Sequence, residues 1–316
     1  MKKLFVLLAC AATMVACEND EIVRQDLGDA IEFGSAHVDK ATRADKATDP
    51  SLNNETFDNF LVWGTVTGGN GLVSIFGGDE VTGTVGYVDH EADPKVPNVW
   101  TCSVKQYWIE GATYNFAALA NAEKNNVTLG DDKLPASVVF TSTTGSTDLV
   151  YSKIDAPIVG KATGQNGPVN LTFEHLLSKV KFTVTNNSTA AEGYSFEITG
   201  IKVTASTEGT CALPAKTWSG LNTATAQTFA NIVIAEADPK EECAAEKLFI
   251  PGQVTVDFTV EIKKDDTTIG KKVHTTSTHT LEVGHAYNFG ITVAVGEEIT
   301  FSVTEAPAWD EPNSLN

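Results

Sequence analysis

Arginine and positive charge are scarce in this chain. Its two arginines, Arg24 and Arg43, lie within the first 43 residues, and none follows up to Asn316 although 17 lysines do. The formal net charge is −19. Such an acidic chain offers no basic patch for nucleic acid or an anionic membrane surface, so we expect neither as a partner. The missing arginine is not explained by acidity alone, because lysine is retained.

Motifs that mark enzymes are also absent. The sequence contains no Gly-x-Ser-x-Gly elbow, Walker loop, HExxH or CxxC. The Gly-rich stretch 67–71 is followed by no helix with a lysine, so it reads as a hairpin turn and not as a phosphate cradle. His274 and His279 stand at an odd spacing within one expected strand, which predicts opposite faces and no shared metal ion. His175 reads as packed or solvent-facing. We therefore expect no catalytic, cofactor or metal site, and no enzyme.

Cysteine is too rare for a disulfide framework. Behind the N-terminal segment only Cys102, Cys211 and Cys243 remain, and an odd number cannot pair completely. Cys211 and Cys243 either pair in the second half or remain buried free thiols.

The first 17 residues read as a targeting signal. "MKK" supplies positive charge, and residues 4–14 form an apolar run too short to cross a bilayer. "MVAC" then places Cys17 after small residues, as in the lipobox of bacterial lipoproteins. "LLAC" ending at Cys10 is a competing match, but it leaves only about half the usual apolar length. A plain secretory signal with an incidental cysteine is the other alternative. We favour Cys17 as a lipidated residue that tethers the precursor to the outer membrane.

What the sequence does contain is short alternating apolar runs without a sustained helical period, which predicts an all-β protein. The polar segment 18–56 is interrupted by one strand-like piece, residues 30–38. A first group of strands is expected at 59–66, 71–77, 98–109, 113–119, 136–142 and 148–154. After the Gly-rich stretch 160–168, a second group is expected at 169–186, 194–206, 228–235, 254–264, 271–283, 286–295 and 298–306. At most a turn or two of helix is expected, near residues 121–125.

One internal echo links the two groups. "GATYNFAAL" and "GHAYNFGIT" share Gly-x-x-Tyr-Asn-Phe, with the tyrosines at Tyr114 and Tyr287. Each copy lies late in its group, which favours two domains of similar topology. A tyrosine at the corner of a β-sandwich normally buries its ring and bonds a neighbouring backbone group. That role explains the echo better than ligand binding does.

Together these features resemble the fimbrillin family, the type V pilins of Gram-negative anaerobes. The resemblance is carried by the lipobox cysteine, the isolated arginine after "KAT", "FEHLLSKVKFTV", "LFIPGQ", "GHAYNF" and the closing "APAWDE". It implies tandem transthyretin-like or Ig-like β-sandwiches. It also implies export as a lipoprotein and a cut after arginine by an arginine-specific surface protease. The cut removes an N-terminal strand, and a strand of another subunit fills the resulting groove.

The resemblance assigns roles to particular residues. Cys17 is the lipidated residue, and cleavage between Arg43 and Ala44 leaves a mature start at Ala44. The removed strand lies in 30–38, with Ile31 and Phe33 as its apolar plugs. The donor strand lies near 298–309, where Ile299, Phe301 and Val303 alternate onto one face. The expected parts are a signal peptide (1–17), a leader (18–43), an N-terminal sandwich (44–166) and a C-terminal sandwich (167–316).

Two functions follow as competing hypotheses. In the first, the chain is a structural subunit of a cell-surface fimbria whose partners are other fimbrial subunits. A subunit cut by an arginine-specific protease gains from having no later arginine. Compositional drift is the alternative, but it explains poorly why arginine is absent after residue 43 while 17 lysines are kept. In the second, a lipid-anchored β-sandwich binds glycans through an aromatic platform drawn from Trp63, Trp100, Trp108 and Trp218. A third class is a lipid-anchored hydrolase, but the sequence contains no recognisable set of catalytic residues for it.

Overall fold

The computed structural model describes residues 28–38, 58–69, 71–84, 99–188, 194–234, 242–243, 246–274, 276–295 and 298–306. Within these ranges the regular secondary structure is β-strand, and the one helical turn is the 3-10 turn η2 (Lys124–Asn126), close to where a short turn was expected. The all-β prediction is confirmed. The described part of the chain contains no helix with the length and apolar character needed to cross a bilayer.

The first half is built on an eight-stranded sheet. Its order is β2-β3-β4-β1-β10-β8-β5-β9, and β2 also pairs with β5, so seven strands close into a ring that includes β1. Its strands are β1 (Phe33–Val38), β2 (Asn59–Gly68), β3 (Gly71–Thr84), β4 (Val99–Cys102), β5 (Thr113–Ala120), β8 (Val150–Lys153), β9 (Ile158–Val159) and β10 (Val169–His175).

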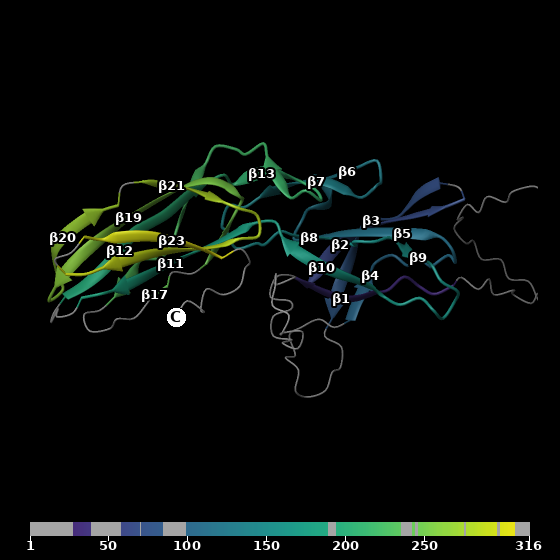
Figure 1. The fold of residues 1–316 in the computed structure, drawn as a ribbon, viewed down its shortest axis with the longest axis horizontal. Helices are drawn as coiled ribbons and strands as arrows, with labels where there is room; N and C mark the ends of the chain where they lie inside the picture. Colours follow the sequence, from purple (N-terminus) through teal and green to yellow (C-terminus); the bar gives the residue numbers. More distant parts are fainter. Residues whose placement is uncertain are drawn as a thin grey trace, which may run out of the picture.

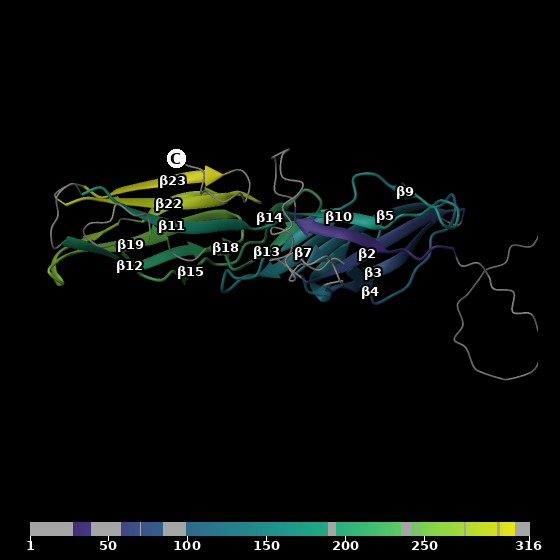
Figure 2. The same cartoon turned by 90° about the horizontal axis from the view of Figure 1, so that it is seen from below.

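The second half is a sandwich of two sheets, drawn on the left of Figure 1. One sheet contains β11 (Ser178–Asn186), β17 (Glu242–Cys243), β18 (Lys247–Phe249), β22 (Ala286–Val293) and β23 (Thr300–Ala306). The other contains β12 (Tyr194–Ala205), β15 (Thr225–Thr228), β16 (Ile232–Ile234), β19 (Gly252–Lys264), β20 (Thr267–Val273) and β21 (Ser277–Leu281). Figure 2 shows the two sheets edge-on, stacked as layers.

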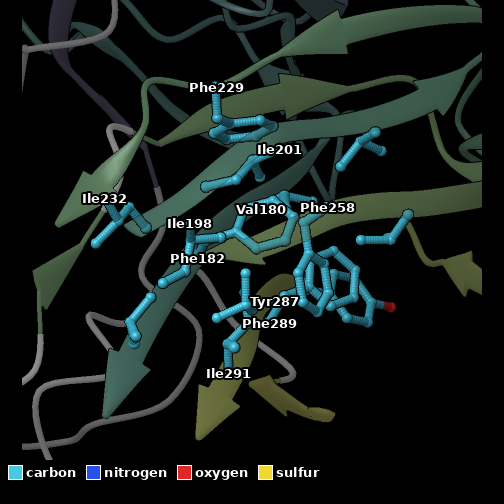
Figure 3. Packing of buried hydrophobic residues seen from close by; sticks show 14 of the residues in the cluster. Val180, Phe182, Ile198, Ile201, Phe229, Ile232, Phe258, Tyr287, Phe289 and Ile291 are labelled. Carbon is cyan, nitrogen blue, oxygen red and sulfur yellow. The ribbon is translucent and has the colours of Figure 1, made fainter. Parts of the chain in front are cut away.

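Alternation along the strands fills this sandwich. In β19 the residues Val254, Val256, Phe258 and Val260 are buried while their neighbours are more exposed, as the sequence predicts. Their side chains meet those of the facing sheet, and Phe182 lies 4.9 Å from Phe229 and 5.2 Å from Phe289 between ring centroids. Figure 3 shows these rings interleaved with Ile198, Ile201 and Ile291. The result is one continuous core from both sheets.

A third, smaller sheet joins the two halves. It contains β6 (Val127–Leu129), β7 (Pro135–Thr141), β13 (Glu208–Ala212) and β14 (Thr217–Ser219), and β7 of the first half pairs with β13 of the second. A separate core that includes Leu176, Leu177 and Ile250 lies at this junction. The expected single strand 169–186 is broken at Leu176–Leu177, so β10 stays in the first sheet and β11 enters the second. The division at residues 166 and 167 stays a prediction about folding units.

The tyrosine echo corresponds to one repeated corner. Tyr114 Oη accepts a hydrogen bond from Ile109 N at 2.7 Å, and Tyr287 Oη accepts one from Glu282 N at 2.8 Å. The two motif glycines, Gly111 and Gly284, have φ angles of +74° and +73°. These left-handed turns favour glycine. The predicted structural role of the motif is confirmed.

Candidate functional site

The strand-like piece of the expected leader is part of the first sheet. β1 runs parallel to β10 and antiparallel to β4, where Phe33 faces Trp100. Ahead of β1 the backbone continues this pairing: Ile31 N donates to Gln106 O at 2.8 Å, and Trp108 N donates to Asp29 O at 2.9 Å. Because β1 lies between two strands of a closed ring, its loss would expose unpaired backbone groups on both β4 and β10.

Both expected plugs of the leader are buried. Ile31 and Phe33 are each 5% exposed. The ring of Phe33 lies edge-on to Phe60 and Phe116 at centroid distances of 6.0 and 6.2 Å, and 5.8 Å from Phe76. Edge-to-face contacts of this kind stabilise beyond the apolar area that they bury. The leader therefore supplies core side chains to the first half.

A carboxylate anchors the start of this segment. Asp29 accepts hydrogen bonds from Gly164 N at 2.8 Å on each of its oxygens, and from Asn166 N and Nδ2 at 3.3 and 3.0 Å. The Asn166 amide is oriented by Lys161, whose N–H donates to Asn166 Oδ1 at 2.8 Å. The Gly164 N–H, with smaller help from Asn166, lowers the pKa of Asp29. The loop thus forms a cradle for a carboxylate, which we call the anion cradle (Gly164 and Asn166).

The expected donor strand is β23, at the edge of its sheet. It pairs with β22 alone among the described strands, from Thr300 opposite Thr292 to Ala306 opposite Ala286. Ile299, Phe301 and Val303 are partly buried and pack against the core of the second half, on one face as expected. Phe301 is the centre of this contact, with ring centroids 5.5 Å from Phe258 and 5.8 Å from Phe289.

The two histidines expected on opposite faces lie together, so that prediction was wrong. His274 Nε2 and His279 Nε2 lie 3.3 and 3.0 Å from the same oxygen, Ser277 Oγ. Both rings also contact Phe301, at 4.7 and 5.7 Å. The prediction assumed one continuous strand with a two-residue alternation of faces. The strand β20 ends at Val273 and β21 begins at Ser277, so the alternation does not continue from His274 to His279.

Acidification should therefore weaken the packing of β23. Burial lowers the pKa of both His274 and His279, so each binds its proton more readily once exposed. Their contribution to stability is present above the unfolded pKa of about 6.5 and is lost as the pH falls from there through the lowered folded pKa. As the pH falls from about 7.5 to 5, we expect the protection of the β23 amides against hydrogen exchange, taken relative to the intrinsic exchange rate at each pH, to decrease.

A double variant tests the assignment. His274→Gln with His279→Gln removes both titrating rings but keeps His285, whose Nδ1 contacts Glu305 Oε1 of β23. The pH dependence of amide protection in β23 should flatten in this variant. An unchanged profile would place the titration elsewhere. Asp257, which raises the pKa of His274, is kept in both proteins.

The remaining expected sites divide into described and undescribed ones. Cys17, Arg24, Arg43, Ala44 and the side chain of Cys243 lie outside the described residues. Cys102 and Cys211 are free thiols, and Cys211 is fully buried. His175 is packed, with Nδ1 2.6 Å from Asp148 Oδ2.

The four tryptophans considered for a glycan platform, all within the described residues, do not form one. Trp63, Trp100 and Trp108 are 2%, 7% and 4% exposed; Trp100 and Trp108 lie in the core of the first half and Trp63 in the core at the junction. Trp218 is partly buried and donates its Nε1–H to Leu176 O at 2.9 Å. Core packing therefore accounts for the described tryptophans, and no observation favours the glycan-binding hypothesis.

Comparison with known proteins identifies proteins similar to most of the chain. A family model described as fimbrillin-like matches residues 42–307, which include β23 but not β1. A crystal structure of a fimbrial protein from Bacteroides vulgatus is similar, with a TM-score of 0.60 and 15% identity over 87% of this chain and 98% of that chain. A candidate cell adhesion protein from Bacteroides ovatus has a TM-score of 0.51 and 15% identity, over 88% and 96%. No curated protein matches.

Proposed function

Because the chain belongs to the fimbrillin-like family, we propose that it is a structural subunit of a cell-surface fimbria, exported as a lipoprotein, cleaved after Arg43 and polymerised by strand exchange. The family is one of structural and not of enzymatic proteins, in agreement with the expectation that the chain is no enzyme. The fold of the Bacteroides vulgatus fimbrial protein supports the same architecture.

The observation that carries the proposal is the position of Arg43 relative to the strands. β1 ends at Val38 and β2 begins at Asn59, so among the described strands β1 alone precedes Arg43. A single cut there separates β1 covalently from every strand with which it pairs. It leaves the other strands connected, and no later arginine offers a second cut.

Loss of β1 creates a groove that another strand can fill. The edges of β4 and β10 lose their hydrogen-bond partner, and the positions of Ile31 and Phe33 become empty. An incoming strand restores the ladder and buries alternate side chains. Two buried side chains of this size contribute about 1.5–3 kcal/mol each before any backbone bond is counted.

The C-terminal strand suits the donor role. Phe301 is only partly buried on its own sheet, whereas Phe33 is 5% exposed in the groove, so exchange moves an aromatic ring to a better-buried place. Donor and groove are different surfaces of one subunit. The contact is heterologous and propagates into a filament.

Arginine-specific cleavage of the purified precursor tests the proposal. We expect cleavage after Arg43, with Arg24 as the other arginine open to the protease, and no cut downstream of Ala44; polymers that resist mild denaturation should follow. Arg43→Ala should leave folding intact, as judged by circular dichroism, and reduce polymer to background. Lys46→Ala, which changes a nearby cation, is the matched control and should assemble normally. Normal fibres from the Arg43→Ala protein would refute the cleavage step.

A further inference from the structure

Two segments at opposite ends of the chain share a pattern that none of the roles above requires. The leader reads Asp29-Ala-Ile31-Glu-Phe33, and the C-terminal segment reads Glu297-Glu-Ile299-Thr-Phe301. In each, an acidic residue precedes isoleucine by two positions and phenylalanine by four. In an extended chain these three side chains fall on the same face.

We propose that the C-terminal segment enters the groove of a second subunit in one register. In it, Ile299 replaces Ile31, Phe301 replaces Phe33, and the carboxylate of Glu297 enters the anion cradle that Asp29 occupies here. The inference rests on the proposed strand exchange and deepens it, because it names the residues that set the register.

The anion cradle explains why a carboxylate is required. Gly164 N donates to both oxygens of Asp29, and Asn166 donates through its backbone N–H and its side-chain Nδ2. Gly164 has φ +82°, a left-handed conformation that favours glycine and holds this N–H in place. Once the leader leaves, Gly164 N and Asn166 N lose this acceptor, while Asn166 Nδ2 keeps its bond to Lys161 O at 2.9 Å. A carboxylate restores charge-assisted bonds, which a neutral side chain does not match.

Neighbouring registers place the wrong chemistry in the groove. A shift by one residue turns the apolar face outward. A shift by two in one direction puts Val303 in the ring-lined position of Phe33 and Ile299 in the cradle. A shift by two in the other direction puts Glu297 in the position of Ile31, which is 5% exposed, and an unpaired charge there is costly.

One position distinguishes the two segments sterically. Gly34 follows Phe33, whereas Ser302 follows Phe301. A Cβ at Gly34 would lie 2.3 Å from Asn170 Oδ1 and 3.1 Å from Pro168 Cβ. Entry of the donor in this register therefore requires the exposed Asn170 side chain to turn aside.

A labelled peptide of residues 296–307 tests the register. It is added to the subunit that has been cleaved after Arg43 and has lost its leader. Fluorescence anisotropy should show saturable binding, and a leader peptide of residues 28–38 should compete for it. Glu297→Gln in the donor peptide should weaken binding about tenfold, because a charged hydrogen-bond acceptor is lost. Glu298→Gln, the matched control one position away, should bind like the wild-type peptide.

A variant of the subunit that accepts the peptide tests the same contact independently. Asn166→Ala in the subunit should weaken the wild-type peptide, but it should weaken the Glu297→Gln peptide much less, since the two changes remove one interaction. A photo-reactive benzoylphenylalanine at position 301 should cross-link to peptides that contain Phe60, Phe76 or Phe116.

The outcomes separate the two proposals. If the wild-type peptide does not bind, strand exchange and register both fail. If it binds but the Glu297→Gln and Glu298→Gln peptides behave alike, or the cross-links fall elsewhere, the register is wrong while strand exchange stands. Failure of the leader peptide to compete would likewise overturn the shared groove.

Discussion

Phe33→Ala should lower the free energy of unfolding of the first half of the precursor by about 3–5 kcal/mol. The ring is 5% exposed and lies within about 6 Å of three phenylalanine rings, at 6.0, 5.8 and 6.2 Å. Truncation leaves a cavity that a closed ring of strands cannot easily fill. Tryptophan fluorescence during denaturation reports on this half through Trp100 and Trp108, which lie in its core, and on the junction through Trp63.

The control for this prediction is the residue next to Phe33 in the chain. Glu32→Ala changes the exposed neighbour in the same segment and should cost little. Cleavage and leader removal should then make wild-type and Phe33→Ala subunits identical, since the altered residue is discarded. A loss below about 1 kcal/mol in the precursor would mean that the leader does not complete the first core.

Phe301→Ala should abolish polymerisation under conditions in which wild-type subunits assemble. Full burial of a ring of this size contributes about 3–5 kcal/mol relative to alanine. The ring already makes part of these contacts in its own subunit, so we expect a loss of at least about tenfold in each contact between subunits. Assembly followed by light scattering and electron microscopy measures the effect. Thr304→Ala, an exposed position on the same strand, is the matched control.

The donor defect must be separated from a folding defect. Phe301 also packs on Phe258 and Phe289 in its own subunit, so the variant is first checked for a folded second half. Its groove is unaltered, and it should still bind the wild-type donor peptide. Fibres of normal length from Phe301→Ala would remove β23 from the donor role.

The sequence predicted the strands well wherever alternation was regular. β19 and β22 lie where the period of two indicated them, and the tyrosine corners were predicted from two short echoes. The same rule misplaced His274 and His279, because periodicity does not show where a chain leaves a sheet and returns. It also extended the strand expected at 98–109, which ends at Cys102.

Long-range pairing was beyond such rules. Nothing in residues 30–38 indicates that β1 lies between β4 and β10, nor that β7 and β13 join the halves. The anion cradle was missed because its donors are mostly backbone groups of a Gly-rich loop, which carry no side-chain signal. The acidic residue before each Ile-x-Phe pair is visible in the sequence, but alone it does not indicate which loop would bind it.

The orientation of the strands has a mechanical consequence. In Figure 1 the strands of the second half, β23 among them, run close to the long axis of the molecule. Backbone hydrogen bonds between strands are roughly perpendicular to them, so tension along this axis loads each ladder in shear, and many bonds must rupture together. A thread of such units would resist hydrodynamic drag far better than one whose strands are peeled apart one bond at a time.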